Sequence, residues 1–326
     1  MRLRFAALLW VVLLLGSSIS FAAGPAATNP AQADADFAFQ GEYVGEVDGA
    51  EGLESWGVQI VALGDGKFQL VGYPGGLPGA GWNEQEKRQA EGVRSGNVVT
   101  FSTDEFTATI QDSTFRVQDS GGQERGTLEK ITRKSPTEGA KPPQGAVVLF
   151  DGSTADHFDG GRLTAEGLLM EGVTSKQKFQ DFSIHIEFIL PYMPAARGQA
   201  RGNSGFYMQG RYEVQMLDSF GLKGENNECG GLYTVAAPRI NMCYPPLSWQ
   251  TYDIDFTAAR YDASGKKTQN ARATVRHNGV LIHDNVEIPH ATRANPLAEG
   301  SEPGPVYLQN HGNPVRYRNI WLVDKQ

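Results

Sequence analysis

The stretch GNSGFYMQGRYEVQMLDS, residues 202–219, predicts two short antiparallel strands joined by a tight turn. Glycine at the first central position of a two-residue hairpin turn supplies the backbone conformation that the turn needs, so we place the turn at Gly210-Arg211. In that register Met208 lies opposite Glu213, and Phe206 lies opposite Gln215. Directly opposed residues share a face of the sheet. One face then carries Ser204, Phe206, Met208, Glu213 and Gln215, and the other carries Tyr207, Val214 and Met216.

The polar residues of this hairpin suggest a binding surface. The carboxylate of Glu213 and the amide of Gln215, held on one sheet face, are well placed to grip a polyhydroxylated ligand. The alternative is a solvent-exposed strand face, which carries polar residues without any function. The periodicity alone leaves both interpretations open.

The sequence around the hairpin is rich in short, regularly spaced apolar runs. FSIHIEFIL, QTYDIDFTA, ARATVRHNG and VRYRNIWLV are examples, and Asn278-Gly279 is a strong hairpin signal between two of them. About ten such strands with almost no helical pattern predict a two-sheet β-sandwich over residues 147–326.

The first half of the chain predicts a separate β domain. Residues 37–133 contain about seven short strand-like runs separated by glycine-rich turns, which indicates a small antiparallel sheet or barrel-like domain. Residues 134–146 are rich in proline, glycine and lysine, a composition typical of a linker.

The N-terminus has the pattern of a signal peptide over residues 1–22. Arg2 and Arg4 precede an apolar run from Phe5 to Leu15, which is too short to span a bilayer comfortably, and Ser20-Phe21-Ala22 fits a cleavage site. Residues 23–36 are predicted to be a flexible leader. We therefore expect an exported protein, in the periplasm or outside the cell, with no membrane span in its mature form.

The charge balance disfavours some classes of partner. The net charge is −8, and removal of Arg2 and Arg4 with the signal peptide makes it −10. Such an acidic chain is not expected to bind nucleic acid or an anionic membrane surface.

Cys229 and Cys243 are the only cysteines. In an exported protein an even pair favours a disulfide, which would close a loop of about 15 residues and stabilise the fold by roughly 3 kcal/mol. Two separate buried thiols are the alternative.

Several spaced blocks of the second half carry a family resemblance. They are GNSGFYMQGRYEVQMLDSFG, NECGGLY, NMCYPPLSWQTYDIDF, RATVRHNGVLIHDNVEIP and VYLQNHGNPVRYRNIWL. Residues 147–323 resemble the 3-keto-disaccharide hydrolase family, also described as 3-keto-glucoside 1,2-lyase and 3-keto-2-hydroxy-glucal hydratase. The resemblance implies a concanavalin-A-like lectin/glucanase jelly-roll sandwich whose concave sheet holds a carbohydrate. It does not extend to the first domain.

The resemblance also implies a reaction on a 3-keto-glycoside. The proton on carbon 2 of such a sugar is acidic, so a base can remove it, the group on carbon 1 can leave, and water can add back. This route needs one positioned base and a group that stabilises the enolate. Glu213 is our candidate base, and His311, in the turn QNHGNP, is the second.

Other side chains in the matching blocks are candidates for binding the sugar. Trp249 and Tyr233 could equally be core residues, and the two arginines of the last strand could equally form a solvated face or pair with Glu213. The full set of substrate-binding candidates is Asn203, Gln215, Tyr233, Trp249, Arg316 and Arg318.

A divalent metal ion of unknown identity is an alternative enolate stabiliser. Asp218 and Glu228 are the candidate ligands, although no HxH or HExxH spacing is present. His277, His283 and His290 lie in or near the Asn278-Gly279 hairpin, and we expect them to face solvent.

Two other functions compete with this reaction. A noncatalytic carbohydrate-binding sandwich would use the same sheet, aromatics and amides. A conventional glycosidase on the same fold normally shows a Glu-x-Asp-x-x-Glu strand. The run from Glu213 to Asp218 reads EVQMLD, which departs from that pattern and argues against a conventional glycosidase.

Overall fold

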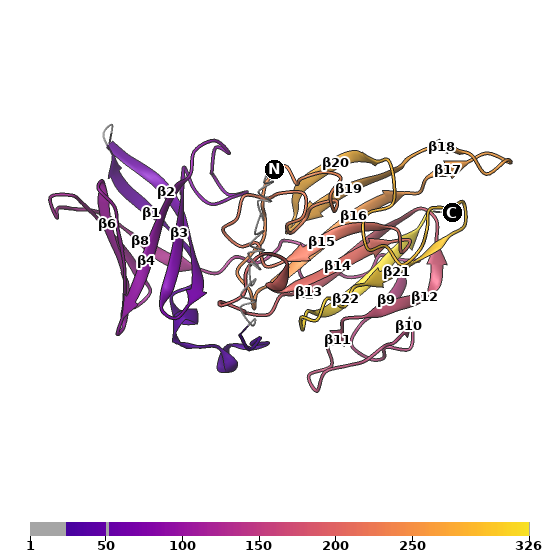
Figure 1. Cartoon of the computed structure of the whole chain (residues 1–326), viewed down its shortest axis with the longest axis horizontal. Coiled ribbons are helices and arrows are strands. Elements are labelled where there is room, and N and C mark those ends of the chain that lie inside the picture. Colours follow the sequence, from indigo (N-terminus) through magenta and orange to yellow (C-terminus); the bar gives the residue numbers. More distant parts are fainter. Residues whose placement is uncertain (1–23, 50–51, 326) are drawn as a thin grey trace, which may run out of the picture.

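The computed structural model describes residues 24–49 and 52–325, which form two β units side by side (Figure 1). The first unit is a closed antiparallel barrel in which each strand pairs with the next and β8 returns to β1. Closure leaves no unpaired strand edge. Its strands are β1 (Gly41–Gly49), β2 (Gly52–Gly64), β3 (Lys67–Pro74), β4 (Arg88–Ser95), β5 (Val98–Ser102), β6 (Phe106–Gln111), β7 (Thr114–Asp119) and β8 (Glu124–Ile131).

The second unit is a sandwich of two sheets. The five-stranded sheet has the order β10 (Phe158–Asp159), β12 (Val173–Phe179), β21 (Gly304–Leu308), β14 (Asn203–Met208) and β15 (Tyr212–Leu217). The seven-stranded sheet has the order β11 (Leu169–Met170), β22 (Arg316–Asp324), β13 (Phe182–Ile189), β16 (Trp249–Thr257), β19 (Ala271–His277) and β20 (Val280–Ile288), with β9 (Val147–Phe150) paired to β22. Strands β17 (Arg260–Tyr261) and β18 (Lys267–Gln269) form a small separate hairpin.

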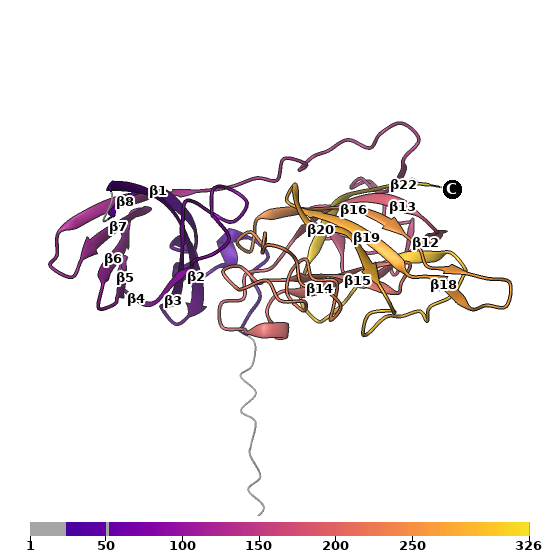
Figure 2. The same cartoon turned by 90° about the horizontal axis from the view of Figure 1, so that it is seen from above.

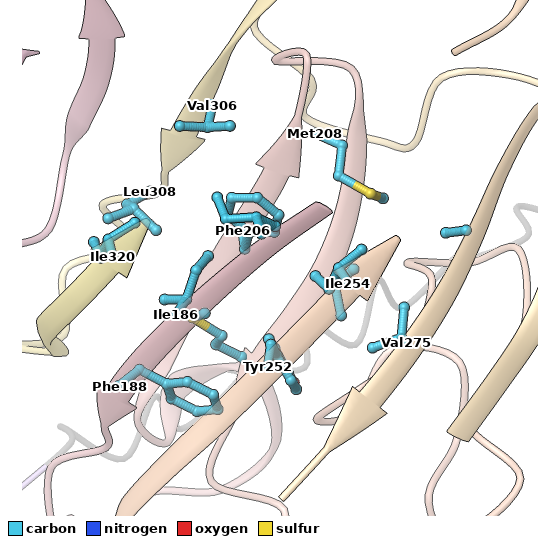
Figure 3. Packing of buried hydrophobic residues seen from close by; sticks show 14 of the residues in the cluster. Ile186, Phe188, Phe206, Met208, Tyr252, Ile254, Val275, Val306, Leu308 and Ile320 are labelled. Atoms are coloured by element: carbon cyan, nitrogen blue, oxygen red, sulfur yellow. The ribbon is translucent and has the colours of Figure 1, made fainter. Parts of the chain in front are cut away.

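The space between the two sheets is filled by side chains from alternate positions of their strands. Phe206 and Met208 of β14 face Ile186 of β13 and Tyr252 and Ile254 of β16, and all five are buried (Figure 3). The prediction of an all-β chain with a small antiparallel domain before a sandwich is therefore confirmed.

The Asn278-Gly279 turn is also confirmed. His277 pairs with Val280, and the two residues between them have φ angles of 50° and 79°. Both are left-handed conformations, which asparagine and glycine adopt most easily.

The leader prediction needs a correction. The described part of the segment, residues 24–36, is not a loose tail, because it contains the 3-10 turns η1 (Pro30–Gln32) and η2 (Ala35–Ala38, which runs past it). Asp36 is buried and accepts hydrogen bonds from Arg94 Nε at 2.6 Å and from Gly66 N at 2.8 Å. Ionic and backbone hydrogen bonds thus fix a segment whose composition suggested flexibility. The predicted signal peptide, residues 1–22, lies outside the described residues.

The barrel packs against one end of the sandwich. Val61 belongs to the hydrophobic core of the sandwich, and Arg201 Nη1 donates to the carbonyl oxygen of Ala62 at 3.2 Å. Across the same boundary the Arg133 guanidinium lies 4.8 Å from the ring centre of Tyr244. Apolar packing and buried hydrogen bonds therefore join the two units.

The segment predicted to be a linker runs along the sandwich (Figure 2). Within residues 134–146, the Thr137 hydroxyl donates to Asp253 Oδ2 at 2.7 Å, and Gly139 N donates to Glu187 Oε1 at 2.5 Å. The linker is thus bonded to β16 and β13 on the outer face of the seven-stranded sheet. In the parts of the chain that are described, no helix has the length and apolar character needed to cross a membrane.

Candidate functional site

The hairpin that carries Glu213 has a different register from the predicted one. Met208 pairs with Tyr212, so the loop has three residues instead of two, and Tyr207 instead of Met208 lies opposite Glu213. Gln209 leaves the strand in a left-handed conformation, with φ of 53°, and its side chain donates to the carbonyl oxygen of Phe179 at 3.0 Å. Glu213 and Gln215 share one face, as predicted, but the predicted residues of the partner strand on that face are wrong, because a shift of one residue moves each side chain of one strand to the other face.

In the observed register Glu213 points away from the sandwich core. We call this outer surface of the five-stranded sheet the Glu213 face; it carries Asn203, Gly205, Tyr207, Glu213, Gln215 and Tyr307. The opposite face of the same hairpin supplies the core residues Phe206, Met208, Tyr212, Val214 and Met216.

Glu213 is held by two neighbours on strand β14. Its Oε2 lies 2.8 Å from the hydroxyl of Tyr207. Its other oxygen lies above Gly205, where an added Cβ would come within 2.0 Å of Oε1. Glycine at this position therefore leaves the space that the carboxylate occupies.

Burial changes the acidity of this carboxyl group. Glu213 is only 2% exposed, and desolvation raises its pKa to about 8, although the hydrogen bond from Tyr207 acts in the opposite direction. Desolvation and the nearby Glu213 also raise the pKa of Tyr207, so that its hydroxyl stays protonated. A carboxyl group with a pKa this close to neutrality is typical of catalytic sites.

Half-buried polar side chains lie around Tyr207, the hydrogen-bond partner of Glu213. The rings of Tyr207 and Tyr307 are 5.4 Å apart, and Gln309 Nε2 donates to the Tyr207 hydroxyl at 3.2 Å. Tyr233 N donates to the carbonyl oxygen of Glu213 at 3.1 Å, which ties the loop after β15 to this strand. Phenol and amide donors are thus gathered around one buried base, an arrangement suited to binding a sugar.

A cluster of amides lies next along the same face. Gln215 Nε2 donates to Gln199 Oε1 at 3.0 Å, and Asn203 Nδ2 donates to the same oxygen at 3.0 Å. Gln215 and Asn203 are buried, whereas Gln199 is partly exposed. The structure therefore brings together Glu213, Gln215, Asn203 and Tyr233 from the predicted set.

The other predicted binding residues lie on the opposite sheet. Trp249 begins β16, and the Arg318 guanidinium stacks 3.8 Å from its ring centre. Arg318 also donates to Glu187 at 2.6 Å, while Arg316 is paired with Glu171. The structure does not bring Trp249 or the two arginines to Glu213, and of the alternatives left open for the arginines, the pairing with Glu213 does not occur.

Among the described residues, Glu213 forms no hydrogen bond with His311 or with the predicted metal ligands. His311 is exposed in the turn after β21. Asp218 forms a buried ion pair with Arg201 at 2.6 Å, and Glu228 accepts backbone hydrogen bonds from Gly224 and Glu225 within its own loop. Within residues 24–49 and 52–325 no cluster of three or more His, Cys, Asp or Glu side chains could hold a metal ion. The candidate ligands do not fit a metal site beside Glu213.

The predicted disulfide is absent, because Cys229 and Cys243 are both free and buried. The Cys229 sulfur lies 3.3 Å from the Tyr252 hydroxyl oxygen, and the Cys243 sulfur lies 3.5 Å from the carbonyl oxygen of Leu217. Burial raises the pKa of the Cys243 thiol. The two thiols are buried, as in the alternative, but they are not separate, because they are hydrogen-bonded to each other.

Two of the three histidines expected at the surface are buried. His277 Nε2 lies 2.9 Å from Gln250 Oε1, and His283 Nε2 lies 2.7 Å from the carbonyl oxygen of Gly230. Burial lowers the pKa of both, to about 3 for His277. His290 is exposed, as expected.

Comparisons with known proteins show the family of the chain. Residues 145–323 match the family described as the 3-keto-alpha-glucoside-1,2-lyase-like domain, and the chain belongs to that family. The comparison with curated proteins gives no match.

The chain is also similar to proteins of known structure. The chain is similar to a "putative glycosyl hydrolase" from Parabacteroides distasonis ATCC 8503, with 32% identity and a TM-score of 0.51, over 56% of this chain and 84% of that one. A second protein of the same description and bacterium is 17% identical, with a TM-score of 0.42, over 56% and 95% of the two chains. The family and the first neighbour identify a carbohydrate-active protein of the hydrolase or lyase type.

Proposed function

We propose that the sandwich domain cleaves 3-keto-glycosides and that Glu213 is the base that removes the proton from carbon 2. The observation that carries this proposal is the state of Glu213: a buried carboxyl group with a pKa raised to about 8, in contact with a single phenol. A conventional glycosidase uses two carboxyl groups about 5–10 Å apart. The Glu213 face as defined above offers one.

The reaction follows from the acidity of the ketone. The ionised Glu213 carboxylate takes the proton from carbon 2, and the electron pair of the broken C–H bond becomes the enolate. The bond between carbon 1 and the aglycone oxygen then breaks, and the departing oxygen takes a proton. Water adds across the new double bond, with its hydroxyl on carbon 1 and a proton returned to carbon 2. The products are the free aglycone and a 3-keto sugar, with one water consumed.

Donors around Glu213 are suited to the charge that develops on the ketone oxygen. The phenols of Tyr307 and Tyr233 and the amide of Gln309 are half-buried and lie around Tyr207. Hydrogen-bond donors fixed before the reaction stabilise an oxyanion far better than water that must reorient. No step of this proposal passes through a metal ion.

The raised pKa supports the role of base. A general base works best when its pKa is near the working pH, because it is then both available and strong enough. An ordinary glutamate, with a pKa of about 4.3, would be a much weaker base toward a carbon acid.

The decisive test compares Glu213→Gln with wild type on 3-keto-trehalose. The amide keeps the shape of the side chain but cannot take a proton, so turnover should fall by ~10²–10⁴-fold. Glu287→Gln, an exposed change on β20, is the matched control and should keep full turnover.

Solvent deuterium tests the route independently of the residue. Cleavage in heavy water should place deuterium on carbon 2 of the product. Retention of the original hydrogen there would reject proton abstraction even if the bond is cleaved. If wild type binds the sugar without cleaving it, a noncatalytic carbohydrate-binding sandwich is the correct function.

A further inference from the structure

We propose that the mouth of the N-terminal barrel is a second binding site, for an uncharged and mainly apolar small molecule. An open pocket of about 520 Å³ lies at the mouth of the barrel, and all the residues that line it fall between Val47 and Leu128. Ligand pockets typically have volumes of roughly 300–1,000 Å³. An eight-stranded barrel is just wide enough either to be filled by its side chains or to hold one small ligand.

The cavity exists because large side chains fill only part of the barrel interior. Inner-face residues such as Ile60, Phe68 and Phe101 are fully buried and form the barrel core. Gly72 is paired with the buried Val58 and so faces the same interior, but it leaves space there. A Cβ at Gly72 would make only ordinary contact, 3.4 Å from the Trp56 ring.

The lining of the cavity is apolar and aromatic at depth. Leu70 and Leu128 are buried in the barrel core and also border the cavity. Two aromatic rings, Phe106 and Trp56, lie nearer its mouth and are only partly buried. An apolar molecule that enters would remove this surface from water, which is favourable in proportion to the area covered.

The charged groups at the mouth select against ions. Arg88 pairs with Glu105 at 2.7 Å, and Arg125 pairs with Asp119 at 2.7 Å, so both arginines of the lining are already neutralised. The lining also includes two further acids, Asp48 and Glu54. An anion would meet a net negative rim, and a charged ligand of either sign would lose hydration on entering the apolar interior.

This site is separate from the proposed reaction. Every residue that lines the cavity precedes the family match at residues 145–323, and the cavity is not formed by any part of the Glu213 face. The inference therefore stands or falls independently of the 3-keto-glycoside proposal.

The test is a titration of the full-length protein with N-phenylnaphthylamine, an uncharged aromatic probe whose fluorescence rises in apolar surroundings. Val117→Trp should fill the cavity, since Val117 lines it. Val93→Trp is the matched control, because Val93 is 63% exposed on strand β4 of the same barrel. We expect saturable binding by wild type and Val93→Trp, and at least tenfold weaker binding by Val117→Trp.

A second cavity-filling variant keeps the test valid if Val117→Trp misfolds. Gly72→Leu should weaken binding of the probe in the same way. Circular dichroism of this variant should show that the barrel is intact. Equal binding by all variants would place the probe elsewhere and overturn the proposal, as would no binding by wild type. Tighter binding of anilinonaphthalene sulfonate than of the neutral probe would refute the preference for uncharged ligands. Turnover of 3-keto-trehalose should be the same in all four proteins.

Discussion

Glu213, the proposed base, is buried by the sheet, accepts a hydrogen bond from one phenol and occupies the space that one glycine leaves. Burial makes the ionised Glu213 carboxylate a stronger base. It also lowers the fraction of Glu213 side chains that are ionised at neutral pH, compared with a glutamate of ordinary pKa. The hydrogen bond from Tyr207 lowers the pKa and so sets the balance between these two effects.

The first prediction concerns this balance. Because Glu213 must be ionised to act, kcat/KM on a 3-keto-glycoside should rise with pH, with its midpoint near the pKa of about 8. Tyr207→Phe removes the donor that favours the ionised form, so the midpoint should move to higher pH. A pH–rate profile of both proteins measures the shift. An unmoved midpoint in Tyr207→Phe would show that Glu213 is not the titrating group.

The same pKa predicts how stability depends on pH. The folded-state pKa of about 8 lies above the ordinary glutamate value of 4.5, so the folded state holds this proton more tightly. Its contribution to stability is complete below about 4.5 and is lost as the pH rises through about 8. Glu213→Gln cannot ionise. The difference between its melting temperature and that of wild type should therefore shift in favour of the variant as the pH rises over this range. A constant difference between the two proteins would contradict the burial argument.

Gly205 allows a prediction about the position of the Glu213 carboxylate. A methyl group there would come within 2.0 Å of Glu213 Oε1, so Gly205→Ala should push the carboxylate away and reduce turnover. A misplaced catalytic group can lower the rate by about 10²-fold. Gly300→Ala is the control, because its nearest neighbour would be 3.7 Å away. Enzyme assays with matched melting curves separate displacement from unfolding, and full activity in Gly205→Ala would show that this space is not needed.

At the scale of the elements, the outer face of the seven-stranded sheet is a polar network covered by the linker. His185 of β13 lies 2.6 Å from Asp253 and 3.4 Å from Glu187, and its ring stacks on Trp321. Thr137 of the linker donates to the same Asp253. The network therefore joins two strands to the segment that connects the domains.

The fourth prediction concerns this network. Burial lowers the pKa of His185, but the hydrogen bonds that its ring donates to Asp253 and Glu187 outweigh burial and leave the pKa above 6.5. A raised folded-state pKa gives stability that is complete below the unfolded value and is lost as the pH rises through the folded value. Unfolding free energy should therefore fall as the pH rises above about 6.5, the ordinary value for histidine. The fall should be smaller in Asp253→Asn, and an identical slope in both proteins would exclude this role for His185.

Local structure could be predicted from the sequence where the residues of a turn determine its conformation by themselves. The Asn278-Gly279 turn needs two left-handed residues and has them. The Gly210 turn was misplaced by one residue because Gln209 is held in a left-handed conformation by a tertiary hydrogen bond to Phe179, which no local pattern reveals. That single shift hid Tyr207, the closest partner of Glu213.

Other site residues were missed for similar reasons. Tyr307, Gln309 and Gln199 come from distant segments, and only the packing of the sheet and its loops brings them near Glu213 or Gln215. Tyr207, Tyr307 and Gln309 do stand in the matching blocks, which is the one signal that could have pointed to them. The buried histidines were missed because their partners, Gln250 and the Gly230 carbonyl, are also remote in sequence.

At the scale of the whole molecule, a buried ion pair joins the barrel to the chain that leaves it. Arg133 donates to both oxygens of Glu42, at 2.7 and 2.5 Å, and to the Pro78 carbonyl oxygen at 2.6 Å. Glu42 is 1% exposed, so it depends on this partner. The guanidinium also stacks on Tyr244 of the sandwich.

The fifth prediction follows from this pair. Arg133→Met leaves the Glu42 charge buried and uncompensated, which should destabilise the protein by about 3–5 kcal/mol. Adding Glu42→Gln removes the stranded charge and should restore part of the loss. Chemical denaturation of wild type, both single variants and the double variant measures the coupling. Additive effects of the two changes would show that the pair contributes no interaction energy.

The docking of residues 24–36 has a consequence for the order of assembly during synthesis. Ala27 pairs with Tyr192, the Tyr192 hydroxyl donates to Asp34 at 2.8 Å, and Tyr192 is part of the barrel core although it comes from the sandwich. The ribosome finishes the last barrel strand at Ile131, and at ~5–20 residues per second it makes Tyr192 several seconds later. Until Tyr192 has been made, one end of the barrel core lacks this aromatic ring. Residues 24–36 are made before the barrel strands, but they can form their native contacts with Tyr192 only after this interval.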